Sequence, residues 1–402
     1  MNNNRWLVLG GATIGLIFGL STFLGISFSI FLKPLSEEFG WSRAEISLSL
    51  TITTIIIIVL GPVIGKLMDK YSVRRILLPS ILFFGLSVAS LNWLSSTIFH
   101  LYLVFGLIAV VGAATLPVSY TKVILGWFDK KRGIALGIAL TGVGIGAVFL
   151  PPTLQWTVSN YGWRHAYLLL AALVILVSFP LIYKLLIEVP PTNSNHSHYK
   201  NDGVSGYSVR QALANPTFWL LVIMFLLLGL ATVGTSVHLM SLFTDRNVSP
   251  ENAALTMSLL GVALIIGRIG GGFLIDRFFA PLVAAFFFTG ATLGFILLAS
   301  GATGVQMSIA VILLGLGFGA EFDLLSYFVS RYLGLKSYAQ IYSYIYGAFS
   351  LGAGFGPLLL GWSFDQNGNY TQGLYLFSAF AATATILLYF LGKYPVLPIE
   401  LS

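Results

Sequence analysis

The stretch GKLMDKYSVRR, residues 65–75, and the later stretch GFLIDR, residues 272–277, decide the architecture of this chain. Their aspartates, Asp69 and Asp276, lie 207 positions apart. A row of three alternate glycines also recurs, at a spacing of 210: Gly142, Gly144 and Gly146 return as Gly352, Gly354 and Gly356. Similar offsets at separate places indicate a parallel duplication of a half-length unit.

The composition indicates a membrane environment. Of the 402 residues, 57% are hydrophobic and 9% are charged, against about 25% charged residues in ordinary soluble domains. A soluble fold of this length could not hide so much apolar surface from water, whereas a lipid bilayer removes that constraint. The absence of cysteine excludes disulfides, thiolate metal sites and cysteine nucleophiles.

Twelve apolar stretches are long enough to cross the hydrocarbon, which takes about 20 helical residues. We place them near 6–32, 46–68, 75–95, 99–125, 133–155, 164–187, 216–241, 252–275, 279–300, 305–328, 337–362 and 371–393. The first is too long for the apolar core of a signal peptide. The sequence thus predicts an all-α membrane protein with two pseudo-symmetric six-helix halves, over 1–189 and 214–402, joined by a cytoplasmic linker over 190–213.

Basic residues give the orientation. With the N-terminus inside, sixteen of the 21 fall in inner segments, four fall in outer segments and one lies within a span. By the positive-inside rule both termini are cytoplasmic, and we expect the inner membrane of a cell as the location. The net charge of +7 is then topological, and we expect no nucleic-acid partner. Two histidines in the linker, His196 and His198, are more typical of a solvated segment than of a metal site, so we expect neither metal nor cofactor.

The stretch over 65–75 resembles the signature loop of the major facilitator superfamily, except that Ser72 stands where glycine is usual. A carboxylate near a helix end can pair with neighbouring helix dipoles and arginines, and such a contact can hold the cytoplasmic side closed. The alternative is that these charges merely face water and enforce topology. The gating candidates in the two halves are Asp69, Arg74, Arg75, Asp276 and Arg277.

Longer stretches narrow the resemblance. FLKPLSEEFGWSRAEIS (31–47), GWFDKKRGIALGIALTGVGIGAVFLPP (126–152) and GAEFDLLSYFVSRYLGLKSYAQIY (319–342) are similar to the bacterial branch of the monocarboxylate transporter family and to the related oxalate/formate exchangers. The likeness runs along nearly the whole chain. It implies the major facilitator fold and transport of a small organic anion by alternating access.

A few charges lie deep within spans. Arg268 in span eight, with Glu321 and Asp323 in span ten, lie about 6–9 Å on the cytoplasmic side of the midplane at a rise of about 1.5 Å per residue. Charges at this depth are costly and mark functional sites by default. The two acids point about 200° apart on a helix, and the sequence does not say which faces the cavity. Tyr327 shares the face of Asp323. The alternative for the set is a structural ion pair.

The resemblance implies that Arg268 holds the substrate carboxylate. Animal members carry an acid one turn earlier, where this chain has Leu264, and a lysine in span one, which this chain lacks before Lys33. Proton coupling must therefore use other groups, and the candidates are Glu321 and Asp323. A single cavity cation favours a monoanion over a dianion. Tyr120 is a further candidate for substrate binding, with the aromatic belt at the membrane interface as its alternative.

No enzyme signature is present, and without a P-loop the chain does not hydrolyse ATP directly. We expect a monomeric symporter or antiporter for a monocarboxylate such as lactate, with protons and the lipid bilayer as its other partners. The alternatives are an exporter of drugs or a carrier of larger carboxylates such as siderophores or sugar acids. The sequence leaves the direction of transport open.

Overall fold

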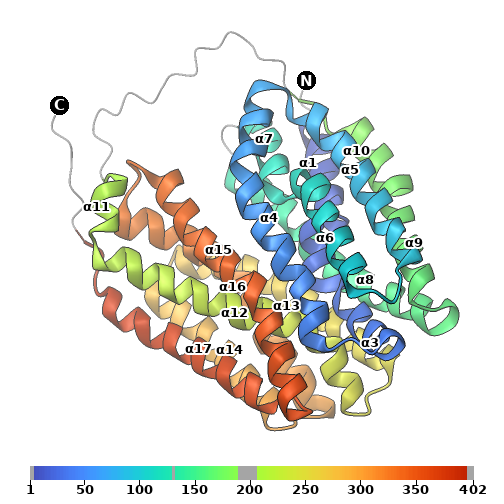
Figure 1. Cartoon of the computed structure of the whole chain (residues 1–402). Helices are drawn as coiled ribbons and strands as arrows, with labels where there is room; N and C mark the ends of the chain where they lie inside the picture. The colour runs from blue at the N-terminus through green and yellow to red at the C-terminus, as the bar shows by residue number, and fades with distance from the viewer. Residues whose placement is uncertain (1–3, 129–131, 189–205, 396–402) are drawn as a thin grey trace.

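The computed structural model describes residues 4–128, 132–188 and 206–395, and almost all of these are helical (Figure 1). Within the described residues, twelve helical stretches are long and apolar enough to cross a membrane, which confirms the predicted spans. The predicted linker lies partly outside the described residues, and its end forms the short helix α11 (Val209–Leu213).

The described helices before the linker are α1 (Asn4–Ile17), α2 (Leu20–Thr22), α3 (Ser29–Phe39), α4 (Arg43–Lys70), α5 (Val73–Ser90), α6 (Ile98–Gly112), α7 (Pro117–Trp127), α8 (Arg132–Tyr161), α9 (Trp163–Ala172) and α10 (Phe179–Leu185). After α11 they are α12 (Pro216–Asp245), α13 (Pro250–Ile275), α14 (Ala280–Ala299), α15 (Gly304–Phe328), α16 (Tyr338–Asn367) and α17 (Thr371–Leu391). Three π-helical segments extend α2, α9 and α15: η1 (Phe23–Ser27), η4 (Leu173–Ser178) and η5 (Val329–Leu333).

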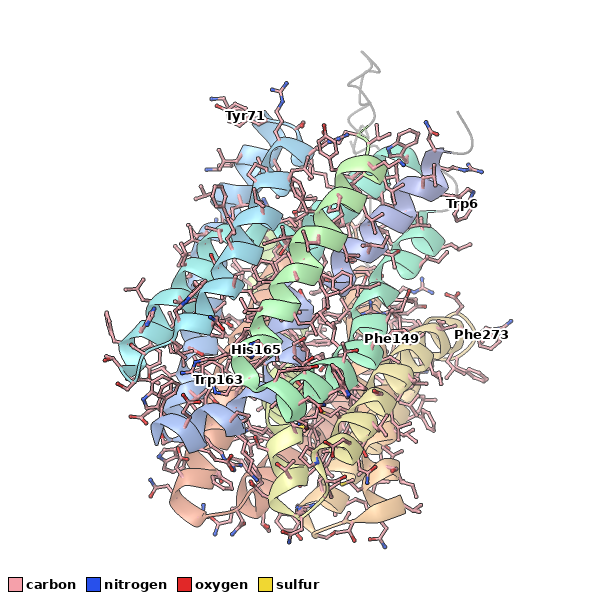
Figure 2. The ribbon with its side chains drawn as sticks, turned by 90° about the vertical axis from the view of Figure 1, so that its right-hand side faces the viewer. Trp6, Tyr71, Phe149, Trp163, His165 and Phe273 are labelled. Atoms are coloured by element: carbon pink, nitrogen blue, oxygen red, sulfur yellow. The ribbon has the colours of Figure 1, made fainter. Side chains whose placement is uncertain are left out.

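Helices α1–α10 lie on one side of the molecule and α11–α17 on the other (Figure 1). Because each side crosses an even number of times, α1 begins and α17 ends at the same end, which we call the terminus end; the opposite end is the far end. Figure 2 shows Trp6 and Tyr71 near the terminus end and Trp163 and His165, at the turn into α9, away from it. Phe149 and Phe273 project outward and are exposed, as lipid-facing aromatic residues are.

The repeated glycines mark equivalent helix contacts in the two halves. A Cβ built on Gly144 of α8 would lie 2.5 Å from Ile265 of α13, and one built on Gly354 of α16 would lie 2.7 Å from Thr54 of α4. Both are contacts between the halves, where small residues let helix backbones approach closely. The contact of α8 with α13 and that of α16 with α4 are therefore related by the duplication seen in the sequence.

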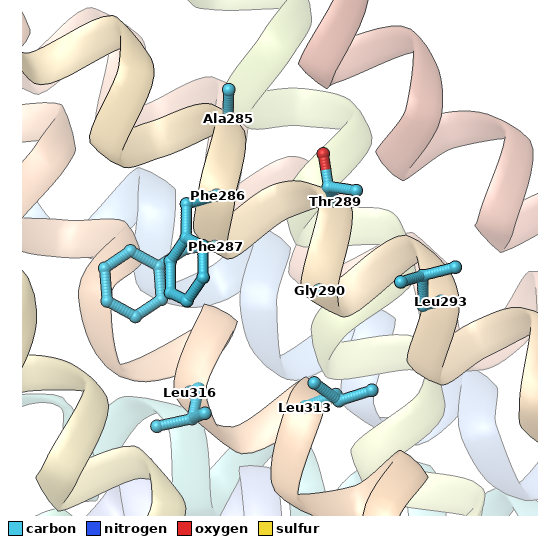
Figure 3. A pocket seen from close by; sticks show the side chains of 8 residues that line it. All are labelled: Ala285, Phe286, Phe287, Thr289, Gly290, Leu293, Leu313 and Leu316. Carbon is cyan, nitrogen blue, oxygen red and sulfur yellow. The ribbon is translucent and has the colours of Figure 1, made fainter.

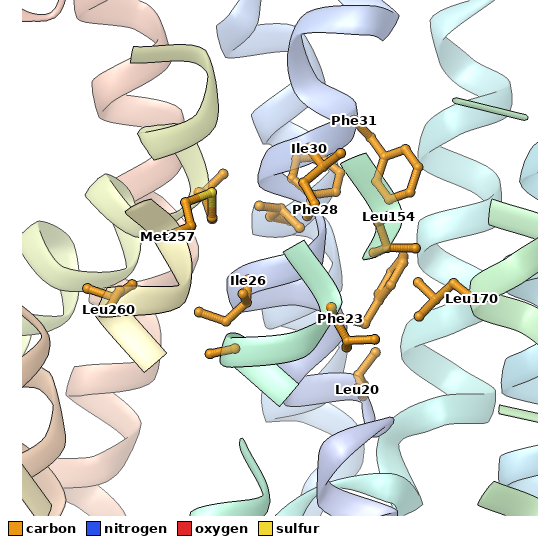
Figure 4. Close-up of a cluster of buried hydrophobic side chains, with 14 of the residues drawn as sticks. Leu20, Phe23, Ile26, Phe28, Ile30, Phe31, Leu154, Leu170, Met257 and Leu260 are labelled. Atoms are coloured by element: carbon orange, nitrogen blue, oxygen red, sulfur yellow. The ribbon is translucent and has the colours of Figure 1, made fainter. Parts of the chain in front are cut away.

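Apolar side chains from both halves meet in one buried cluster toward the far end (Figure 4). Met257 and Leu260 of α13 face Ile26 of η1, and Phe28 and Ile30 lie in the same cluster. The turns at this end are well defined, because Gly40 ends α3 with a positive φ of 70° and Ser42 caps α4. This cluster seals the far end.

Hydrogen bonds between the halves form a series that begins at the far end. Ser159 of α8 donates to Glu251 at 2.9 Å, and Ser258 of α13 donates to the carbonyl of Val148 at 2.7 Å. Toward the terminus end this series reaches Arg268. Beyond it the ribbons of the two halves diverge (Figure 1), and Val59 of α4 and Tyr344 of α16 are 66% and 56% exposed. The structure is thus sealed at the far end and open toward the terminus end.

Candidate functional site

Arg268 lies where the seal between the halves gives way to the open side. It is half-buried on α13, and its Nη1 donates to the carbonyl of Leu140 on α8, in the other half, at 3.2 Å. Its Nε is buried and has no hydrogen-bond partner in the part of the chain that the structure describes. Phe322 lies beside it, with 5.9 Å between the guanidinium carbon and the ring centroid. The guanidinium therefore retains donor capacity for an anion.

Close packing of α13 on α15 brings the acids of α15 to this arginine. A Cβ built on Gly319 would lie 2.8 Å from the backbone nitrogen of Arg268, and one built on Gly267 would lie 2.8 Å from the Cα of Leu316. Any larger side chain at either glycine would push the helices apart. The small residues of α15 thus serve to place Asp323 and Phe322 near the guanidinium.

The two acids of α15 have different surroundings. Asp323 is half-buried and interacts electrostatically with Arg268. Glu321 is only 2% exposed, and its Oε1 has no hydrogen-bond partner among the described residues. Its neighbours Ala320 and Leu324 belong to the core of the C-terminal half. Of the two, Asp323 is therefore the acid that shares the site with Arg268.

The two candidate tyrosines lie elsewhere. The hydroxyl of Tyr327 accepts a hydrogen bond from Nε of Arg331 at 3.2 Å, one turn further along the chain. Tyr120 is fully buried, its ring fills the space beside Gly15 of α1, and its hydroxyl has no hydrogen-bond partner within the described ranges. Neither tyrosine contacts Arg268 through a hydrogen bond between described residues, so their roles in substrate binding stay predictions.

Arg74 and Arg75, two gating candidates of the N-terminal half, form hydrogen bonds to residues of the same half. The backbone N–H of Arg74 donates to Glu188, its guanidinium donates to the carbonyl of Tyr183 at 2.5 Å, and the N–H of Arg75 donates to Ser72 at 3.3 Å. The side chain of Asp69 lies outside the described part of the structure. The predicted lock, which would close the terminus end, stays a prediction.

Their counterparts lie at the end of α13. Asp276 caps the helix, where its backbone N–H donates to the carbonyl of Gly272 at 3.3 Å. The guanidinium carbon of Arg277 lies 3.5 Å from the ring centroid of Phe273.

A row of aromatic residues on α16 accompanies the site, and the sequence analysis missed it. Tyr338, Tyr342 and Tyr346 stack with centroid separations of 5.8 and 6.0 Å, and Tyr346 stacks on Phe349 at 6.2 Å. Tyr342 interacts electrostatically with both Arg268 and Asp323. The spacing of four between the tyrosines, which places them on one helix face, is the signal that could have identified the row.

An apolar pocket on α14 and α15 is separate from this site (Figure 3). Phe286, Phe287, Leu313 and Leu316 line it, and Thr289 supplies its one hydroxyl. It has no charged group that could hold an anion. Arg268 therefore remains the candidate anion site.

Comparisons with known proteins show which family this chain resembles. A family model described as Major Facilitator Superfamily matches residues 12–357. Monocarboxylate transporter 11 of Homo sapiens is 26% identical over 393 residues, which cover 92% of this chain and 79% of that protein. Monocarboxylate transporter 13 of Rattus norvegicus is 26% identical over 391 residues, covering 93% of this chain and 86% of that protein.

Solved structures share the fold. A bacterial homologue of the human lysosomal transporter Spinster, in an inward-facing and unoccupied conformation, superposes with a TM-score of 0.75 at 18% identity over 97% of each chain. The nucleoside transporter NupG superposes with a TM-score of 0.73 at 16% identity, over 98% of this chain and 100% of that one.

Proposed function

The chain belongs to the Major Facilitator Superfamily, and on that premise we propose that it carries a small monocarboxylate such as lactate across the membrane by alternating access. It is a multi-pass membrane transporter and not an enzyme. Its relatives named monocarboxylate transporters suggest the substrate class.

The observation that carries the proposal is the state of Arg268. Arg268 is half-buried, its Nε has no hydrogen-bond partner among the described residues, and its Nη1 donates to a backbone carbonyl of the opposite half, so the guanidinium has donors to offer a carboxylate. The planar guanidinium meets a carboxylate with two parallel hydrogen bonds and keeps its charge at any physiological pH. An anion bound there would replace Leu140 and release one contact between the halves.

The charges around Arg268 favour a monoanion. Asp323 already offsets part of its positive charge, so a second negative charge on the substrate would lack a partner. Oxalate exchangers, which this chain resembles, meet that need with a further lysine in span eleven, where α16 carries tyrosines. A substrate with a single carboxylate is therefore preferred.

Asp323 supplies a route to proton coupling. While Arg268 is free, its positive charge favours the ionised form of Asp323. A bound carboxylate neutralises that charge, so Asp323 then takes up a proton, and release of the anion reverses both steps. Substrate and proton would move together, with Glu321 as the alternative proton carrier.

The row of tyrosines favours a second candidate, a larger carboxylate. Tyr342 beside Arg268 presents a flat, mainly apolar surface, against which a bulkier acid could pack. Benzoate and gluconate serve as probes of this alternative.

Uptake into proteoliposomes tests the proposal. Labelled lactate, pyruvate, acetate, oxalate, benzoate and gluconate are offered with and without an inward proton gradient. We expect uptake of a monoacid, stimulated by the gradient, that is lost in Arg268→Gln and retained in Arg210→Gln, which removes an exposed arginine on α11. Failure of folded protein to take up any of the acids would refute the monocarboxylate proposal.

A further inference from the structure

Four charged side chains join the two halves at the far end. Asp245, at the end of α12, accepts from Lys33 at 3.0 Å and pairs with Arg43 at 2.6 Å, both from the opposite half. Asp365 of α16 accepts from the backbone N–H groups of Arg43 and Ala44 at 3.0 and 2.9 Å, so it caps the beginning of α4. We call this set, with the residues it contacts below, the far-end latch.

Arg43 connects these charges to an aromatic residue further inside. Its side chain is nearly buried, and its guanidinium carbon lies 3.6 Å from the ring centroid of Phe364. Its Nη1 donates to the hydroxyl oxygen of Tyr370. Tyr370 precedes α17 and is itself buried.

His238 completes the latch and is fully buried where α4, α12 and α16 meet. Its Nδ1 lies 2.9 Å from the hydroxyl of Tyr370. Its Nε2 lies 2.9 Å from the carbonyl of Pro357 on α16 and 3.2 Å from the hydroxyl of Ser47 on α4. The imidazole thus touches both halves of the molecule.

These partners determine where the hydrogens lie in the sealed state. A carbonyl can only accept, so Nε2 of His238 carries the hydrogen that points to Pro357. Arg43 can only donate, so the hydroxyl of Tyr370 accepts from it and donates its own hydrogen onward. That hydrogen goes to Nδ1 of His238, which must therefore be bare. The chain from Arg43 through Tyr370 and His238 to Pro357 is complete only while the imidazole is neutral.

We propose that His238 is a proton-binding site whose protonation releases the far-end latch. A proton on Nδ1 makes it a second donor to Tyr370, whose hydroxyl hydrogen then loses its acceptor. The imidazolium also adds a positive charge near Arg43. Asp245 on α12 already pairs with Arg43, and Asp365 accepts hydrogen bonds from the backbone of α4, so neither carboxylate is placed to balance the added charge. Separation of the halves relieves both conflicts, because water then reaches the ring.

This inference rests on the proposed transport by alternating access, and it gives protons a second point of action. Asp323 responds to an anion at Arg268, whereas His238 responds to the proton concentration at the far end. By linkage, a proton that binds the opened far end more tightly than the sealed one shifts the molecule toward opening. If the termini lie in the cytoplasm, the far end faces the exterior. An acidic exterior would then favour opening of the far end, so that substrate sites without a bound anion become accessible from outside.

The natural absence of cysteine allows a direct test. Spin labels at Trp93→Cys, after α5, and Val305→Cys, on α15, report the separation of the halves, because both native side chains are exposed, at 70% and 76%, and lie at the far end. Distances are measured without substrate in lipid nanodiscs at about pH 8 and about pH 5, which spans the titration of an ordinary histidine.

We expect the ratio of open to sealed far ends to rise about tenfold at the lower pH, as the loss of one buried hydrogen bond predicts. His238→Gln, which cannot be protonated, should remove this response, and Tyr370→Phe should diminish it. Asp323→Asn should retain it, which separates this site from the substrate site. A native far end that does not respond to pH, or a full response in folded His238→Gln, overturns the proposal, whatever the outcome of the uptake experiments.

Discussion

Substitution of Gly354 by alanine should move the molecule out of the state seen here. A Cβ at this position would lie 2.7, 2.8 and 2.9 Å from Cβ, Cγ2 and Oγ1 of Thr54 on α4. Contacts below 3.0 Å require a shift, and a β-branched threonine in a helix has few rotamers to escape to. The methyl group therefore acts as a wedge between the halves.

The wedge affects one conformation only. Overpacking of this kind costs about 1–3 kcal/mol, and the cost applies while α4 and α16 are in contact at the far end. The gain in helix propensity from glycine to alanine, about 0.5–1 kcal/mol, is the same in both conformations and cancels. The ratio of far-end-open to far-end-sealed molecules should thus rise about 5–150-fold.

Gly347 on the same helix provides the matched control, because a Cβ built there meets no atom within 4 Å. Spin labels at Tyr71→Cys and Phe273→Cys, two exposed positions in opposite halves (Figure 2), report closure of the terminus end. We expect a shorter distance in Gly354→Ala and no change in Gly347→Ala. Equal distance distributions in the two variants would refute the assignment of this contact to the sealed state.

Three further predictions concern acidic residues. Asp365→Asn removes the charge that caps α4, which should cost the sealed state about 1 kcal/mol and raise the open fraction about fivefold in the far-end distance measurement; the exposed Glu37→Gln should not. Asp323→Asn should remove most of the gradient stimulation of uptake and Glu321→Gln less of it, whereas an equal loss would contradict the placement of Asp323 alone beside Arg268. Burial raises the pKa of Glu38, but hydrogen bonds from Trp163 and Arg164 outweigh it and hold that pKa below its ordinary value. Its stabilisation, about 0.5 kcal/mol at such exposure, is therefore present near neutral pH and lost as the pH falls below about 4. The difference in melting temperature between native protein and Glu38→Gln should be seen at pH 7 and vanish at acidic pH; a constant difference would contradict it.

The spans were predictable because length and hydropathy alone determine which helices cross a bilayer. The end of the first span was not. We placed it at 32, whereas the structure ends the span at Ser27 and starts α3 at Ser29. The apolar run continues through Leu32, which is fully buried against other helices. Hydropathy cannot distinguish side chains buried in protein from side chains that face lipid.

The site was predictable in part. Arg268 and the acids of α15 stood out because charges deep in a span are rare, and helical periodicity showed that the two acids diverge. Which acid lies near Arg268 depends on how α15 is rotated about its axis where it packs on α13 at Gly319. No local sequence pattern encodes this rotation. The ion pairs of the far-end latch were missed because Lys33 and Arg43 lie in outer segments and were counted as charges that set topology, while their partner Asp245 lies about 200 positions away.

The central claim is that Arg268 binds the carboxylate of the substrate. Isothermal titration of lactate, and of the uncharged analogue lactamide, into native protein and Arg268→Gln tests it most directly. We predict that lactate binds native protein at least about 30-fold more tightly than Arg268→Gln, since loss of a buried charge-pair partner costs about 2–5 kcal/mol, and that lactamide binds neither. Equal affinity of lactate for folded native protein and folded Arg268→Gln would contradict the claim.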